Sequence, residues 1–200
     1  MQKFFWIFLG LILLVGGCGF VGGKNAYNSM VDKEEQVEAQ WAQVENVYQR
    51  RMDLIPNIVE TVKGYANFEA GTLTEVTSAR ARVGQMTVDK EVLENPELLQ
   101  KFNDAQGELT GALNRLMVVS ENYPELKANT QFQQLIVELE GSENRIAVER
   151  KKFNEAAQDY NKFIRKFPNN IYAGFFNFDD VAYFKAQSGA ETAPKVDFNN

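Results

Sequence analysis

The sequence predicts an all-α fold: an antiparallel four-helix bundle with two long helices, preceded by an N-terminal membrane anchor and followed by an irregular aromatic tail. Three observations support this prediction. Apolar residues recur at spacings of three and four over long stretches, turn signals interrupt them at few places, and an uncharged segment of 20 residues lies near the N-terminus. The predicted boundaries are residues 1–26 for the anchor, 27–167 for the bundle and 168–200 for the tail.

The composition of the 200-residue chain excludes several classes of function. Histidine is absent, which excludes Ser-His-Asp and Cys-His triads and histidine-bearing zinc and di-iron sites. The single cysteine, Cys18, excludes disulfide frameworks and thiolate metal clusters. With 21 Lys+Arg against 27 Asp+Glu, the formal net charge is −6, which argues against nucleic acid as a partner. We therefore predict no catalytic residue, no metal site and no cofactor.

The predicted anchor is the uncharged segment 4–23, which lies between Lys3 and Lys24. As a helix it would be roughly 30 Å long, the thickness of a hydrocarbon core. One interpretation is an uncleaved transmembrane helix. The other is a lipoprotein signal, because residues 15–17 lead into Cys18, the candidate for lipidation. In both, the segment binds membrane lipid, and the distribution of positive charge favours a bundle on the non-cytoplasmic side.

The first bundle helix is predicted to run from about Asn28 to Asn67. Its apolar stripe is interrupted in type only by Arg51, and it contains Pro56, which cannot donate a hydrogen bond to the carbonyl of Met52. We expect a kink at this proline. The stripe positions are Val37, Trp41, Val44, Tyr48, Arg51, Ile55, Ile58, Val62 and Tyr65.

Two further helices follow before the last one. Thr72 and Glu75 have the spacing of a capping box, which predicts a short helix as far as about Gly84. Asn95-Pro96 supplies an N-cap and a proline at the first helical position, and Tyr123-Pro124 ends that helix. Its stripe is wholly apolar: Leu98, Phe102, Ala105, Leu109, Ala112, Leu116 and Val119.

The last long helix is predicted from Thr130, as its cap, to about Phe167. It is nearly as long as the first, so the two should pair along most of their length. Two charged residues interrupt its stripe, which consists of Phe132, Ile136, Leu139, Glu143, Ile146, Arg150, Phe153, Ala157, Tyr160, Ile164 and Phe167.

Antiparallel alignment of the two long helices pairs positions whose numbers add to about 195–197, which places Arg51 within one turn of Glu143. We predict a buried ion cluster of Arg51, Glu143 and Arg150, with Asp53 and Asn57 as further acceptors, because a lone buried charge costs several kcal/mol. Three interpretations remain open. In the first, the charges serve only to fix the register of the two helices. In the second, their side chains turn away from the helix contact and form surface pairs. In the third, the two arginines hold an anion.

Aromatic residues are dense after Pro168. One interpretation is a strap that folds back over one end of the bundle. The other is docking on a neighbouring copy or at the lipid interface, where the far end of the tail could add a strand to another subunit. The candidate partner or interface residues are Tyr172, Phe175, Phe176, Phe178, Tyr183, Phe184, Val196 and Phe198.

Several strings in the chain resemble the bacterial LemA family. They are YNSMV (27–31), WAQVENVYQRRMDLIPNIVETVKGYA (41–66), ENYPELK (121–127), FQQL (132–135), EGSENRIAVERKKFN (140–154), YNKFIRKFPNN (160–170) and PKVDF (194–198). The resemblance implies a membrane-anchored helical bundle of the cell envelope without an established enzymatic activity. One departure is Phe68, since many members carry histidine before the glutamate that is Glu69 here.

Three functions follow as hypotheses. The first is a non-enzymatic, membrane-anchored scaffold or adaptor whose protein partner is unknown. The second is an envelope-organising homo-oligomer assembled through bundle faces and the aromatic tail. The third, which no constellation of residues supports, is an enzyme that uses carboxylate, tyrosine or lysine chemistry.

Overall fold

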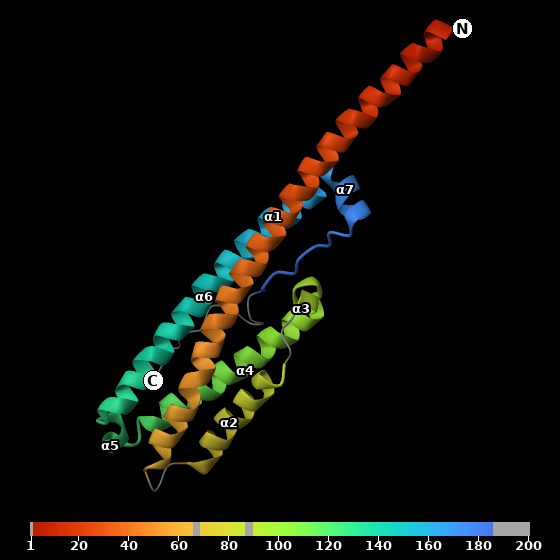
Figure 1. Cartoon of the computed structure of the whole chain (residues 1–200). Coiled ribbons are helices and arrows are strands. Elements are labelled where there is room, and N and C mark those ends of the chain that lie inside the picture. Colours follow the sequence, from red (N-terminus) through yellow and green to blue (C-terminus); the bar gives the residue numbers. More distant parts are fainter. Residues whose placement is uncertain (1, 66–68, 87–89, 186–200) are drawn as a thin grey trace, which may run out of the picture. The chain divides into compact units, whose positions relative to one another are not determined.

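The computed structural model describes residues 2–65, 69–86 and 90–185, and every regular element in these ranges is a helix (Figure 1). This confirms the predicted all-α class. In chain order the helices are α1 (Gln2–Lys63), α2 (Ala70–Gly84), α3 (Lys90–Glu94), α4 (Pro96–Ser120), α5 (Pro124–Lys127), α6 (Thr130–Arg165) and α7 (Asn169–Phe176).

Helix α1 is longer than predicted, because the N-terminal segment and the first bundle helix form one element. The helix is continuous through residues 23–28, before the predicted start at about Asn28. Gly22 and Gly23 each disfavour a helix by about 1 kcal/mol, and a long helix on both sides tolerates that cost. By length and hydropathy, none of the helices in the described ranges qualifies as a membrane span.

Among the described residues, side-chain caps lie at the starts of α4 and α6. The Asn95 side chain accepts hydrogen bonds from the amides of Glu97 (2.9 Å) and Leu98 (3.3 Å), as predicted. Helix α6 is capped by Asn129, whose side chain accepts from the amide of Phe132 at 3.0 Å, and the predicted cap Thr130 is the first helical residue instead. The capping box predicted at Thr72 is wrong, because α2 already begins at Ala70.

The carbonyl that Pro56 leaves without its helical donor is satisfied from a neighbouring helix. Helix α1 continues through Pro56, and the side chain of Arg80 on α2 donates from Nε to the Met52 carbonyl at 3.2 Å. A buried carbonyl without a donor costs about 1–3 kcal/mol, so this contact compensates for the proline.

The chain divides into two compact units. Of the described residues, the first contains 2–42 and 152–181, and the second contains 43–65, 69–86, 90–151 and 182–185. In the first unit, the rings of Trp41 on α1 and Phe153 on α6 pack edge to face at 5.3 Å, and Lys33 lies 5.7 Å from the ring of Phe163. The two helices therefore run antiparallel within this unit.

The second unit is built from α2 to α5 with the adjoining parts of α1 and α6. Helices α2 and α4 pack side by side (Figure 1), and α1 and α6 again run antiparallel, since Tyr65 contacts Asn129 and Arg51 contacts Glu143. Apolar side chains from α1, α2, α4, α5 and α6 form one core: Leu54, Ile55, Ile58, Val59, Val62, Val76, Ala79, Val83, Leu109, Ala112, Leu113, Leu116, Leu126, Phe132 and Leu139.

Candidate functional site

The most deeply buried charge among the described residues is Arg51, whose side chain is 1% exposed. From α1, its Nη1 donates to the carboxylate of Glu143 on α6 and, at 2.8 Å, to the hydroxyl of Thr110 on α4. Its Nη2 donates to the side-chain carbonyl of Gln106, also on α4. One guanidinium thus connects three helices of the second unit.

The pairing explains how an arginine is accommodated in an otherwise apolar stripe. A buried charge is tolerated when an opposite charge and hydrogen-bond acceptors replace the lost water, and the planar guanidinium can contact several acceptors at once. Glu143 supplies the charge, and its side chain is 36% exposed, so only one end of the pair is fully removed from solvent.

An aromatic side chain covers Arg51 on the side of the preceding turn. The ring centroid of Tyr48 lies 5.3 Å from the guanidinium carbon, and the rings of Tyr48 and Phe102 form a T-shaped pair with centroids 5.2 Å apart. Burial raises the pKa of the Tyr48 hydroxyl above its ordinary value, although the positive charges of Arg150 and Arg51 oppose this effect. Tyr48 is therefore protonated at neutral pH and is not a base.

A polar cavity of about 270 Å³ adjoins this cluster. Its inner part is formed by buried residues, and its rim by Ala147, which is exposed, and by the half-buried Gly107, Thr110, Glu143 and Arg150. The full lining is Tyr48, Arg51, Asn103, Gln106, Gly107, Thr110, Glu143, Ile146, Ala147 and Arg150.

Arg150, predicted as the third member of the cluster, lines this cavity and is held by the C-terminal segment. Its guanidinium carbon lies 4.5 Å from the ring centroid of Phe184, and its Nη2 donates to the Lys185 carbonyl at 3.1 Å. The lining therefore carries two positive charges and the single negative charge of Glu143, and the cavity favours a negatively charged occupant.

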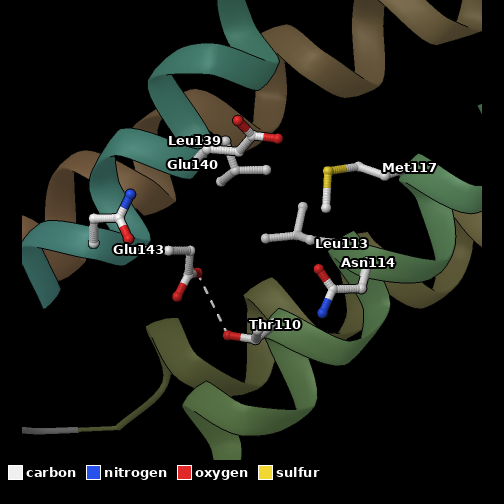
Figure 2. A pocket seen from close by; sticks show the side chains of 8 residues that line it. Thr110, Leu113, Asn114, Met117, Leu139, Glu140 and Glu143 are labelled. Atoms are coloured by element: carbon white, nitrogen blue, oxygen red, sulfur yellow. Dashed lines mark hydrogen bonds between the residues drawn. The ribbon is translucent and has the colours of Figure 1, made fainter. Parts of the chain in front are cut away.

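A second cavity, of about 440 Å³, lies between α4 and α6. Figure 2 shows Leu139, Glu140 and Glu143 on one side, with Thr110, Leu113, Asn114 and Met117 opposite them. The dashed line joins the Thr110 hydroxyl to Glu143 at 3.5 Å, and these two residues also line the first cavity. The pair thus forms a common wall between the two cavities.

The structure does not bring Asp53 and Asn57 into the cluster. Both are exposed, and Asp53 accepts a hydrogen bond from Gln49 at 2.7 Å. Residues two and six positions after Arg51 lie about 200° and 240° around a helix from it, on the face opposite the seam. The acceptors come from α4 instead.

Asn103, Gln106 and Thr110 are the site residues that the sequence analysis missed. They form a polar row at spacings of three and four on α4, between the buried Leu99 and Leu113. This spacing was the available signal. It was overlooked because the predicted stripe used Leu98 and Ala105, which are only half-buried, in place of this adjoining face.

The aromatic tail residues of the first unit lie against α1. The ring of Tyr172 on α7 lies in the space that a side chain at position 23 would occupy, and the rings of Phe176 and Phe178 lie 4.9 and 5.6 Å from that of Tyr27. Phe175 is 77% exposed. Helix α7 ends at Asn177 in the left-handed conformation, which asparagine tolerates.

Residues after α7 are attached to the helices by polar contacts. The Asn161 side chain exchanges hydrogen bonds of 2.8 and 2.9 Å with the backbone of Val181, and Arg165 contacts both carboxylate oxygens of Asp180. In the second unit, the Ala182 amide donates to the Leu93 carbonyl at 2.7 Å.

The remaining predicted tail and anchor residues have different placements. Phe184 is buried and Tyr183 is exposed. Val196 and Phe198 lie outside the described residues, and the side chain of Cys18 is also outside them although its backbone belongs to α1. Among the residues that the structure describes, no group of three or more cysteine or carboxylate side chains could hold a metal ion.

Comparison with known families agrees with the strings found in the sequence. The profile described as "LemA family" matches residues 40–198, which include the whole Arg51 cluster. The chain belongs to the LemA family. The LemA resemblance inferred from the sequence strings is thereby confirmed.

Individual relatives extend the match. Over 188 residues the chain is 29% identical to protein LemA of Metamycoplasma hominis, a match that covers 93% of this chain and 80% of the relative. It is 27% identical over 182 residues to magnetosome protein MamQ 2 of Paramagnetospirillum magneticum, covering 83% of this chain and 67% of that protein. For magnetosome protein MamQ of Magnetospirillum gryphiswaldense the identity is 26% with the same coverage.

Proposed function

We propose that this LemA-family chain is a non-enzymatic, membrane-anchored protein of the cell envelope that acts as a scaffold or adaptor through its helical bundle. The observation that carries the proposal is an exposed aromatic surface on α7, beside the end of the uncharged segment 4–23 of α1. The names of the magnetosome relatives support a role in a cellular structure.

The surface has the chemistry of a membrane interface. It surrounds an apolar cleft of about 540 Å³ lined by Gly23, Lys24, Tyr27, Ile171, Tyr172, Phe175 and Phe176. Aromatic rings favour the headgroup region of a bilayer, and a lysine at the end of an apolar helix can extend its ammonium group to the lipid phosphates. Segment 4–23 would then insert while α7 rests at the interface.

The scaffold part of the proposal rests on the exposed helical faces and on the chemistry of the cluster. Val118 on α4 and Val137 and Val148 on α6 are large apolar side chains that face solvent, and such residues can contribute to a protein interface. In the Arg51 cluster the carboxylate is paired and the tyrosine hydroxyl is protonated, so no nucleophile and base are poised together.

The test is photo-crosslinking of the full chain in its own membrane, with a photoreactive phenylalanine analogue placed at Phe175 or at Val118. We expect the Phe175 position to label lipid and the Val118 position to label a second protein. The same photoreactive residue placed at Val137 tests the exposed face of α6 in the same way. Release of the full chain by alkaline carbonate, or labelling of water-soluble components only, would contradict the membrane assignment.

A homo-oligomer is the second candidate, favoured by the exposure of Phe167 and Phe175. In that case both positions label another copy of the chain, and the detergent-extracted particle has a multiple of the monomer mass. Substitution of Phe175→Glu would reduce that mass to the monomer value. A monomeric particle that labels only other molecules excludes this candidate and favours the adaptor.

A further inference from the structure

Asn103 occupies an unusual position for an amide side chain. It is 2% exposed, and neither its amide nitrogen nor its amide oxygen has a hydrogen-bond partner among the residues that the structure describes. Among the described residues, the Nε atom of Arg51 is also buried without a hydrogen-bond partner. Nearly all buried polar groups in proteins are paired, so a cluster of unpaired ones calls for an occupant or a bound ion.

These atoms belong to one place. Asn103 and Arg51 both line the cavity of about 270 Å³ in the second unit, together with the hydroxyl-bearing Tyr48 and the guanidinium of Arg150. The residues that line the cavity thus include Arg51 with one unpaired donor, Asn103 with an unpaired amide, and one more positive than negative charge. The second cavity, shown in Figure 2, has a more apolar lining that includes Leu113, Met117 and Leu139.

We propose that this cavity binds a small organic anion with one carboxylate or phosphate group next to a hydroxyl or amide group. The anionic oxygens contact the guanidinium of Arg150 and are attracted by the buried positive charge of Arg51. The neighbouring polar group exchanges hydrogen bonds with the Asn103 amide, which turns toward the cavity to meet it. Charge-assisted contacts of this kind are about twice as strong as neutral ones, which offsets the loss of water on entry.

The size of the cavity limits the ligand. Pockets for drug-sized molecules measure roughly 300–1,000 Å³, so a cavity of about 270 Å³ fits a small metabolite-like anion and not a lipid chain or a peptide. Entry occurs at the rim, where Ala147 is exposed and Gly107 has no side chain to obstruct it. Ordered water is the competing occupant, and the experiment below separates the two.

The test uses thermal unfolding of the full chain in detergent with N-acetylglycine, lactate or inorganic phosphate, each against chloride at equal ionic strength. A ligand that binds only the folded state raises the melting temperature in proportion to the logarithm of its excess over Kd. We expect at least one of the three anions to do so. The arms distinguish carboxylate from phosphate as the preferred anionic group.

Two variants locate the effect. Asn103→Leu has a similar volume and removes the unpaired amide, so we expect it to unfold at the same or a higher temperature without ligand and to lose the shift. Asn114→Leu is the control: Asn114 lies on the same helix but lines the second cavity, so this variant should keep the full shift. Arg150→Met changes a residue at the rim and should weaken the apparent affinity for the anion at least tenfold, which lowers the shift in melting temperature. This variant also provides the test if Asn103→Leu fails to fold.

Several outcomes overturn the proposal. One is the absence of any shift beyond chloride in the native chain, which leaves water as the occupant. Another is a shift that persists unchanged in Asn103→Leu or Arg150→Met. A destabilised Asn103→Leu chain that retains the shift would assign Asn103 a purely structural role. None of these results bears on the crosslinking pattern that tests the scaffold function.

Discussion

Helices α1 and α6 form two kinds of seam. In the first unit the contact is apolar, because Trp41 packs on Phe153 and the neighbouring stripe residues Ala157 and Tyr160 are buried. In the second unit the same two helices meet at Arg51 and Glu143, beside a polar cavity. One helix pair and one heptad pattern thus support an apolar seam in the first unit and a seam beside a polar cavity in the second.

The difference shows what a polar residue in a heptad stripe requires. An apolar position needs only a partner of suitable shape on the facing helix. Arg51 needs acceptors in several directions, and a third helix, α4, supplies them through Gln106 and Thr110. The polar seam occurs in the unit that contains α4.

The largest expected effect belongs to the apolar seam. Phe153→Ala should lower the free energy of unfolding by about 3–5 kcal/mol, because it removes a fully buried ring and leaves a cavity against Trp41. Urea denaturation of the full chain in detergent measures this loss. Phe175→Ala, which truncates an exposed ring of the same type, is the control and should cost less than about 0.5 kcal/mol. Equal losses would show that the first unit does not depend on this seam.

The polar seam should lose somewhat less when it is broken. Glu143→Ala leaves Arg51 buried without its counter-charge, and we expect a loss of about 3 kcal/mol, at the lower end of the range for buried pairs because Glu143 is partly exposed. Replacement of both residues, Arg51→Leu with Glu143→Leu, should restore most of the stability. The control is Glu138→Ala, whose pair with Arg50 is exposed on both sides and should contribute less than about 1 kcal/mol.

Two results of that series would contradict the interpretation. If Glu143→Ala costs no more than Glu138→Ala, water reaches Arg51 and the pair behaves as a surface contact. If the double variant is less stable than Glu143→Ala alone, the guanidinium contributes through Gln106 and Thr110 more than through the carboxylate.

The sequence permitted prediction of the elements that depend on local patterns. Apolar spacing predicted the helical class, and Asn95-Pro96 predicted the start of α4 because capping involves only neighbouring residues. The meeting of Arg51 with Glu143 followed from the antiparallel register, with pairs whose numbers add to about 194–196 in the structure.

The remaining features depend on a third helix or on competition between local signals. The angle at which α4 approaches the seam decides that Gln106 and Thr110, not Asp53 and Asn57, surround Arg51. A periodic pattern does not contain that angle. Likewise, asparagine and threonine are both favourable N-cap residues, so the sequence alone does not decide between Asn129 and Thr130. The path of the chain from α5 into α6 decides which of them caps the helix.

A smaller loss of stability is expected when the hydrogen bond from Arg80 on α2 to the Met52 carbonyl on α1 is removed. Arg80→Ala removes the donor to the Met52 carbonyl and should cost about 1–2 kcal/mol in urea denaturation. In a Pro56→Ala background, the restored backbone amide can donate to that carbonyl, so the same substitution should cost less than about 0.5 kcal/mol. Arg82→Ala, in an exposed pair with Glu108, should behave alike in both backgrounds. A cost for Arg80→Ala that is independent of residue 56 would rule out this explanation.

The smallest effect concerns the boundary of the polar seam on α1. Asp53→Ala should change the free energy of unfolding by less than about 0.5 kcal/mol, because Asp53 is exposed and contacts only Gln49 among the hydrogen bonds described above. Gln106→Leu is the informative partner, since it removes an acceptor from a buried guanidinium and should cost about 1–2 kcal/mol. Both are measured by the same urea titration. If Asp53→Ala proves the more damaging of the two, the acceptors of Arg51 lie on α1 after all, and the polar seam would need only the two long helices that also form the apolar one.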